Sequence, residues 1–87
     1  MKIEQFKVKN QIMTIDDNGT SFLKSYDSMV CKIDKAGNIT LGKNWNYSKT
    51  TSKYVGWFIE EITGQKMNKG IIEKLIKQGN ILVDETL

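Results

Sequence analysis

The sequence contains no arginine, no histidine and no proline, and it has a single cysteine. Without histidine it can form neither a zinc quartet of the common Cys/His type nor a Cys/His nucleophile pair. Cys31 cannot form an internal disulfide, and its apolar surroundings at 28–33 favour a small buried side chain over a reactive thiol. The sequence therefore lacks the histidine and the reactive cysteine on which acid–base, nucleophilic and metal catalysis usually depend. We therefore expect a protein that is not an enzyme, with no catalytic residue, no metal and no cofactor.

The positive charge comes from lysine alone. Thirteen lysines and ten acidic residues give a net charge of +3. Residues 1–47 hold seven lysines and five acids, and residues 48–87 hold six and five, so no basic tail stands out. Lysine is a flexible point charge, whereas specific base readout usually relies on the planar guanidinium group. The composition thus allows weak, salt-sensitive binding of nucleic acid but does not favour sequence-specific recognition.

Long apolar runs are also missing. No stretch of about 20 apolar residues could cross a bilayer, so we expect no membrane association. Residues 1–7 alternate charged and apolar side chains and lack the apolar core of a signal peptide, which predicts a cytoplasmic location in the host cell. The 87 residues are expected to form one domain, 1–87, whose modest core would gain stability from a partner or from a homodimer.

The first half of the chain has β-type patterning. Apolar and charged residues alternate over 6–9, and apolar residues resume at 12–15, which suggests one long or interrupted first strand. Turn-forming sequences at 16–19 and 34–38 favour hairpins. We therefore predict a meander of about four antiparallel strands over 5–42.

The second half changes to a helical period. Apolar residues at 54, 55, 58, 59 and 62 lie on one face of a helix that Ser48 or Thr50 can cap and Gly64 can end. Gly56 lowers the stability of that helix by about 1 kcal/mol relative to alanine, which suggests close packing against its backbone. A second helix begins after Asn68 and stops near Gly79.

Two helices joined by a short link could also form a DNA-reading corner. The second helix, however, offers little beyond Asn68 and lysines for base edges, so packing against the sheet is the better interpretation. The apolar residues 81–83 could form a last strand. The predicted fold is α+β, with an antiparallel sheet of about four or five strands (residues 5–42, with 80–83 as the further strand) packed against two C-terminal helices at about 50–63 and 69–78.

The stretch 41–58 is the most distinctive part of the chain, because it holds both tryptophans, two of the three tyrosines and three lysines. Aromatic rings can stack on bases or anchor a protein interface while lysines follow phosphates. The alternative is that Trp45 and Tyr47 close the core where strand meets helix. The residues that we predict to bind a partner are Lys43, Trp45, Tyr47, Lys49, Lys53 and Trp57.

Two motifs in the chain resemble a family of small bacteriophage and mobile-element proteins. The first is Ser25-Tyr26-Asp27-Ser28, and the second, after Leu41-Gly42, is Trp45-Asn46-Tyr47-Ser48-Lys49-Thr50-Thr51-Ser52-Lys53. The family pattern is Ser-Tyr-(Asn/Asp)-Ser, then Leu-Gly, then Trp-(Asn/Asp)-Tyr-Ser-x-Thr-Thr-x-Lys. The resemblance covers about residues 20–58 and brings no catalytic residue with it.

The resemblance implies a protein that binds and blocks a host machine, of which anti-CRISPR proteins are the best-known kind. The expected partner is then a host defence complex, namely a CRISPR effector or its guide-RNA groove. The alternative is a phage nucleic-acid-binding or regulatory protein that uses the same face. A third reading is an accessory protein that dimerises through the strand at 81–83.

Overall fold

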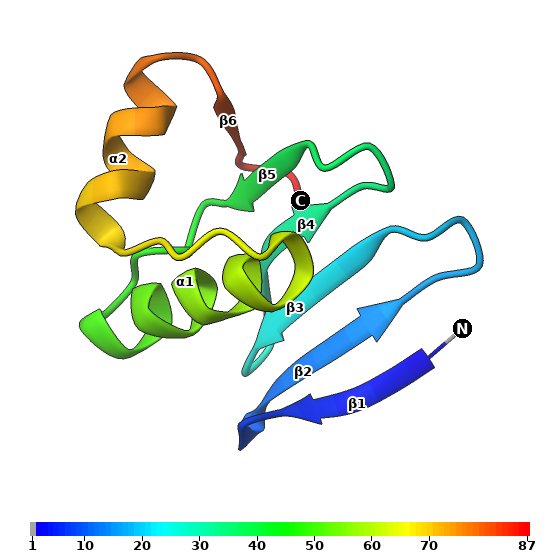
Figure 1. Cartoon of the computed structure of the whole chain (residues 1–87). Coiled ribbons are helices and arrows are strands. Elements are labelled where there is room, and N and C mark those ends of the chain that lie inside the picture. The colour runs from blue at the N-terminus through cyan, green and yellow to red at the C-terminus, as the bar shows by residue number, and fades with distance from the viewer. Residues whose placement is uncertain (1) are drawn as a thin grey trace.

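In the computed structural model, which describes residues 2–87, a six-stranded sheet carries two helices on one face (Figure 1). This architecture confirms the predicted α+β class, with one or two strands more than expected. The elements in chain order are β1 (Lys2–Phe6), β2 (Val8–Ile15), β3 (Ser21–Ser25), β4 (Ser28–Ile33), β5 (Ile39–Gly42), α1 (Lys49–Thr63), α2 (Lys69–Lys77) and β6 (Ile81–Asp84).

The first strand is two strands rather than the single interrupted one that we predicted. The chain reverses at Lys7, whose φ is +66°, so that β1 and β2 pair antiparallel and Phe6 opposes Val8. The side-chain alternation continues on both sides of Lys7, and no glycine or Asn-Gly pair marks the turn. Patterning alone therefore could not locate this reversal.

The last strand makes the sheet mixed rather than antiparallel. Strands β1 to β5 form an antiparallel meander in chain order, but β6 pairs parallel with β5, with Ile39 opposite Ile81. The chain leaves β5, forms both helices and returns to the same end of the sheet, which is the crossover that parallel pairing requires. The expected strand at 80–83 is thus present. The prediction that the sheet is antiparallel was wrong for this strand, because it runs parallel to β5.

The helix ends follow the local signals. The Ser48 hydroxyl caps α1 by accepting a hydrogen bond from the Thr51 N–H at 3.1 Å, and Gly64 ends the helix with a φ of +78°. At α2 the Asn68 side chain accepts from the Ile71 N–H at 2.9 Å. Gly64 was predicted to end α1, Ser48 was one of the two residues predicted to cap it, with Thr50, and the second helix was predicted to begin after Asn68.

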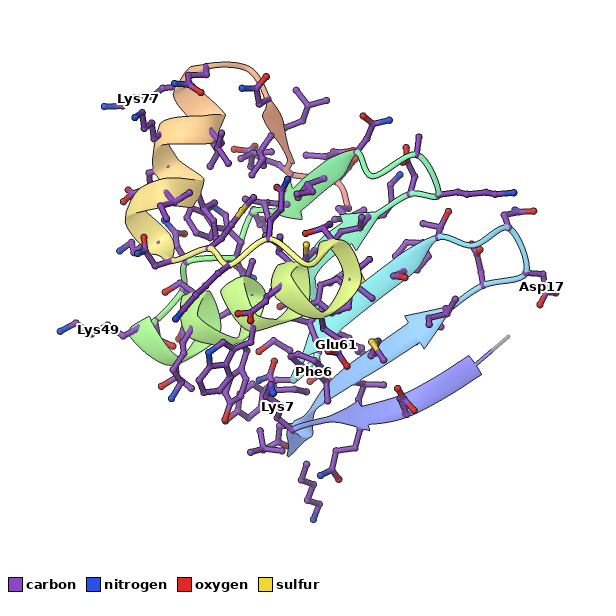
Figure 2. All side chains as sticks on the ribbon, in the orientation of Figure 1. Phe6, Lys7, Asp17, Lys49, Glu61 and Lys77 are labelled. Atoms are coloured by element: carbon purple, nitrogen blue, oxygen red, sulfur yellow. The ribbon has the colours of Figure 1, made fainter. Side chains whose placement is uncertain are left out.

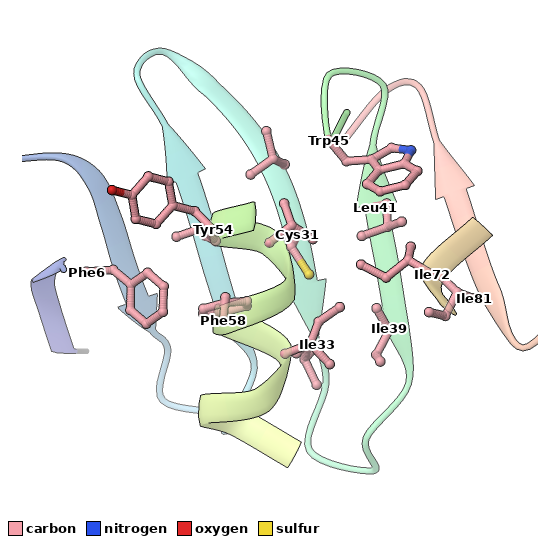
Figure 3. Packing of buried hydrophobic residues seen from close by; sticks show 14 of the residues in the cluster. Phe6, Cys31, Ile33, Ile39, Leu41, Trp45, Tyr54, Phe58, Ile72 and Ile81 are labelled. Carbon is pink, nitrogen blue, oxygen red and sulfur yellow. The ribbon is translucent and has the colours of Figure 1, made fainter. Parts of the chain in front are cut away.

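The core lies between α1 and the inner face of the sheet (Figure 3). Leu23 pairs with Met13 on one side and with Cys31 on the other, which aligns buried side chains in a row across three strands. Phe58 of α1 meets Phe6 edge-to-face, with ring centroids 5.8 Å apart. The end of β1 therefore packs against α1. This contact places the reversal at Lys7 beside α1.

Gly56 marks the closest approach between α1 and the link that leads to α2. A Cβ at this position would lie 2.6 Å from the backbone oxygen of Met67. Only glycine lets the two backbones meet this closely. The close packing that the sequence suggested at Gly56 is therefore present, and it brings the 66–69 segment alongside the exposed side of α1.

Candidate binding site

The exposed side of α1 carries Trp57. Its neighbours Val55, Phe58 and Ile59 are buried, but the Trp57 side chain keeps 39% of its surface exposed. Tyr54 meets the indole edge-to-face, with ring centroids 5.2 Å apart and an interplanar angle of 80°. The indole is thus supported on one side and open to solvent on the other, as an anchor for a partner should be.

Two lysines from distant parts of the chain converge on this ring. The Lys53 ammonium lies 5.0 Å from the Trp57 ring centroid, one helical turn away, and the Lys7 ammonium lies 5.3 Å from it. Figure 2 labels Lys7 beside Phe6 at the end of β1. Both distances are within the range of cation–π attraction, so the lysines are held over the indole while their charges remain available to an anion.

Sequence reasoning missed Lys7. It lies 46 positions before Lys53 in the chain, and only its left-handed turn and the Phe6–Phe58 contact bring it to α1. The sequence holds no local signal for this, because alternating charged and apolar residues are equally typical of an uninterrupted strand.

A pocket of about 340 Å³ opens next to the indole, between α1 and the start of α2. Four lysines and one glutamate are among its lining residues, which gives it a positive balance. We call it the lysine–tryptophan pocket; it is lined by Lys49, Ser52, Lys53, Trp57, Glu60, Lys66, Met67, Asn68 and Lys69.

The structure brings together three of the six residues predicted to bind a partner, namely Lys49, Lys53 and Trp57. Tyr47 is 82% exposed but lines a separate pocket on the other side of the first turn of α1. Lys43 is exposed on the loop that follows β5.

Trp45 has a different position. Its side chain is only 5% exposed and belongs to the core cluster, where Figure 3 shows it beside Leu41. The core role that the sequence left open for Trp45 is thus the observed one. A buried indole cannot serve as a projecting anchor, so we omit Trp45 from the surface proposed to bind.

Among residues 2–87 there is no group of three or more Cys, Asp or Glu residues that could hold a metal ion. Burial raises the pKa of the Cys31 thiol far above its ordinary value, which keeps the thiol protonated and unreactive. Within the same residues, neither helix is long and apolar enough to span a membrane.

The chain was compared with known proteins. The model of a protein family, described as a family of unknown function (DUF8033), matches residues 1–74. The matched range includes strands β1 to β5, helix α1 and most of α2, and it ends before β6. A search of curated proteins found no match, and neither did a search of solved structures.

Proposed function

Because the chain belongs to DUF8033, a family of unknown function, we propose its function from its own geometry and sequence. The protein is a small, non-enzymatic binding protein of a phage or mobile element that inhibits a host defence complex. Its target is a CRISPR effector, and it engages that target with the lysine–tryptophan pocket and with Lys7 beside it.

One observation carries this proposal: an exposed indole flanked by two ammonium groups at the edge of a lysine-lined pocket. Tryptophan is among the residues that contribute most to binding energy at protein interfaces. Four lysines next to it provide attraction toward an acidic or phosphate-bearing surface, which increases the rate of association. A guide-RNA groove on an effector protein combines both kinds of surface.

The sequence adds support of another kind. The motifs at 25–28 and 45–53 resemble those of small bacteriophage and mobile-element proteins, in which blocking of a host machine by binding is a common mode of action. Such a protein needs no catalytic residue, because occupying the target's working surface is sufficient.

The same pocket also favours a second candidate, a nucleic-acid-binding or regulatory protein of a phage. An exposed aromatic ring can stack on a base while neighbouring lysines contact phosphates. In that case the logarithm of the affinity for DNA or RNA falls linearly with the logarithm of the salt concentration.

Inhibition in cells tests the first candidate. Cells whose CRISPR system eliminates a targeted plasmid would express the wild-type protein, the double variant Trp57→Ala/Lys53→Ala, or the control Ile3→Ala/Lys24→Ala. The control removes one exposed apolar and one exposed lysine side chain from the strands.

The assay uses a panel of cells with different CRISPR effectors, one of which is the cognate effector. We expect cells that express the wild type or the control to keep the plasmid. Cells that express the folded double variant should lose it. Equal protection by the folded double variant would remove the lysine–tryptophan pocket from the mechanism. Binding of the isolated protein to nucleic acid, with the salt dependence given above and without inhibition, would favour the second candidate.

A further inference from the structure

A second pocket joins the two stretches of sequence that carry the phage-protein resemblance. It has a volume of about 290 Å³ and lies between the turn that connects β3 to β4 and the loop that leads from β5 into α1. We call it the tyrosine pocket; it is lined by Ser25, Tyr26, Asp27, Ser28, Val30, Asn44, Tyr47 and Thr51.

Two tyrosines provide its aromatic surface. Tyr26 is 65% exposed and Tyr47 is 82% exposed. Tyr26 has a φ of +55°, a conformation in which glycine or asparagine is the usual residue of a tight turn. Backbone stability therefore does not explain a bulky aromatic residue here, whereas a role for its side chain in the pocket does.

Two hydroxyl groups of the pocket are held by side-chain amides, one from Gln11 and one from the lining residue Asn44. The Ser25 hydroxyl oxygen accepts a hydrogen bond from Gln11 Nε2 at 2.9 Å, and the Ser28 hydroxyl oxygen accepts one from Asn44 Nδ2 at 3.1 Å. Each hydroxyl keeps one proton to donate, since the amide already occupies an acceptor position. Two lining groups are thus available as donors toward a bound molecule.

The buried side chain of Gln11 indicates that the hydrogen bonds behind the tyrosine pocket do not serve the stability of the fold alone. Its side chain is 98% buried, because only 2% of the residue is exposed, and its Oε1 has no hydrogen-bond partner within residues 2–87. A buried amide with one unpaired atom lowers stability relative to an apolar side chain of similar size. The Nε2 of the same amide donates the hydrogen bond that holds the Ser25 hydroxyl of the pocket.

These features favour one class of ligand. The serine donors favour an acceptor on the ligand, because an arginine or lysine side chain would leave these two protons without a partner on the ligand. Asp27 is the one carboxylate among the lining residues; it requires a donor and repels a phosphate. The tyrosine rings favour a planar, polarisable group. A ring that bears a carbonyl oxygen beside an N–H satisfies all three.

We propose that the tyrosine pocket binds one nucleobase with such an edge, uracil or guanine, with its face against the exposed tyrosine rings. The base carbonyl accepts from the serine hydroxyls, and the neighbouring ring N–H donates to Asp27. Adenine and cytosine lack a ring N–H on this edge and bind more weakly. The base belongs either to a free nucleoside or to a single strand of nucleic acid.

This site goes beyond the proposed function and is distinct from the lysine–tryptophan pocket. The two pockets share only the first turn of α1, from which Thr51 lines one and Lys49 lines the other. The binding test uses the isolated protein, so a negative result here leaves inhibition of a host complex untouched.

Fluorine NMR of the full chain with 3-fluorotyrosine tests the proposal. The three tyrosines give three signals, of which the one from the buried Tyr54 serves as an internal reference. Uridine and cytidine are matched probes, because they differ only on the base edge and neither carries a phosphate. We expect uridine to shift the signals of Tyr26 and Tyr47, and cytidine to bind about tenfold more weakly.

Two variants and one further probe complete the experiment. Tyr47→Ala removes an exposed wall and is expected to weaken uridine binding about tenfold, and Asp27→Asn is expected to reduce the preference for uridine over cytidine to near unity. Ile3→Ala, an exposed apolar substitution on β1 that lines neither pocket, is the control and should bind uridine like the wild type. A six-residue oligouridylate that binds at least tenfold more tightly than uridine would identify a single strand as the source of the base, and equal affinities would identify a free nucleoside.

Equal binding of cytidine and uridine, or no shift of either exposed tyrosine up to the solubility limit of uridine, would overturn the proposal.

Discussion

Among single residues, Lys7 is the one that the structure adds to the predicted binding surface. Its ammonium lies almost as close to the Trp57 ring as that of Lys53, yet it comes from a turn at the other end of the chain. The attraction of a cation to the indole face does not depend on which element supplies it. The charge that surrounds Trp57 is therefore shared between β1–β2 and α1.

This sharing leads to the first prediction. Lys7→Gln and Lys53→Gln each remove one charge but keep most of the side-chain stem, so both should weaken inhibition of the host complex to a similar extent, about three- to tenfold. Lys9→Gln, an exposed lysine on the neighbouring strand, is the matched control. Dose-dependent plasmid protection measures the effect, and a loss confined to Lys53→Gln would show that Lys7 plays no part in binding.

The second prediction concerns Cys31. Burial raises the pKa of its thiol, so in the native protein it should not react with a disulfide reagent until the chain is unfolded with guanidinium. Because the unfolded chain loses the proton first, the free energy of unfolding should fall as the pH rises above about 8.5, the ordinary thiol pKa. Unfolding at pH 7 and pH 10 would show this decrease for the wild type relative to Cys31→Ala. An identical pH dependence of the two proteins would contradict it.

The third prediction concerns the left-handed conformation of Tyr26. At ordinary positions alanine is more stable than glycine, but at a φ of +55° the order should reverse by about 1 kcal/mol, because alanine retains the steric penalty that glycine escapes. Denaturant unfolding of Tyr26→Gly and Tyr26→Ala measures the difference. If Tyr26→Ala proved the more stable of the two, strain at this turn would not account for the choice of residue.

At the scale of elements, the approach of α1 to the 66–69 segment depends on Gly56, which gives the fourth prediction. Helix propensity alone would make alanine more stable here by about 1 kcal/mol. Since a Cβ would meet the Met67 carbonyl oxygen at 2.6 Å, Gly56→Ala should instead lower the free energy of unfolding by about 1–3 kcal/mol.

The matched control lies in the second helix. A Cβ at Gly70 would meet only the Asn68 side chain, at 3.4 Å, so Gly70→Ala should raise stability by up to about 1 kcal/mol. Thermal unfolding distinguishes the two variants, since 1 kcal/mol corresponds to roughly 4–8 °C in a domain of this size. Stabilisation by both substitutions would mean that the backbones at Gly56 and Met67 are not in contact.

The elements also show what could be predicted from the sequence. The ends of both helices were correct, because capping by Ser48 and Asn68 and termination at Gly64 depend only on neighbouring residues. The reversal at Lys7 and the parallel direction of β6 were missed. Both depend on contacts between distant segments, namely the packing of Phe6 on Phe58 and the crossover of two helices, which no local pattern encodes.

For the molecule as a whole, the same division between local and distant contacts applies to the candidate site. The 41–58 stretch was predicted to hold the partner-binding residues, and three of these, Lys49, Lys53 and Trp57, line one pocket. Lys66 and Lys69 reach it because the link between the helices runs back along α1 (Figure 1), whereas Trp45 is buried in the core cluster. The composition of a segment indicates its chemistry, whereas its partners depend on the tertiary fold.

Dimerisation is also a property of the whole molecule. In β6, which occupies one edge of the sheet, Leu82 and Val83 are exposed. An exposed edge with apolar side chains is a surface on which a second copy can pair, as expected for a small domain with a modest core. Light scattering over a range of concentrations measures the mass. If β6 forms such an interface, Leu82→Lys should shift the protein toward the monomer, and a mass unaffected by this change would exclude β6 as the contact.

The most direct test of the central claim is a tagged pull-down from a lysate of the natural host, with and without nuclease, comparing the wild type with Trp57→Ala/Lys53→Ala. We predict that the wild type retains a single CRISPR effector complex after nuclease treatment and that the folded double variant does not. Retention of the same complex by both proteins would contradict the role of the lysine–tryptophan pocket. Recovery of only nucleic-acid-associated proteins, all lost with nuclease, would contradict inhibition of a defence complex.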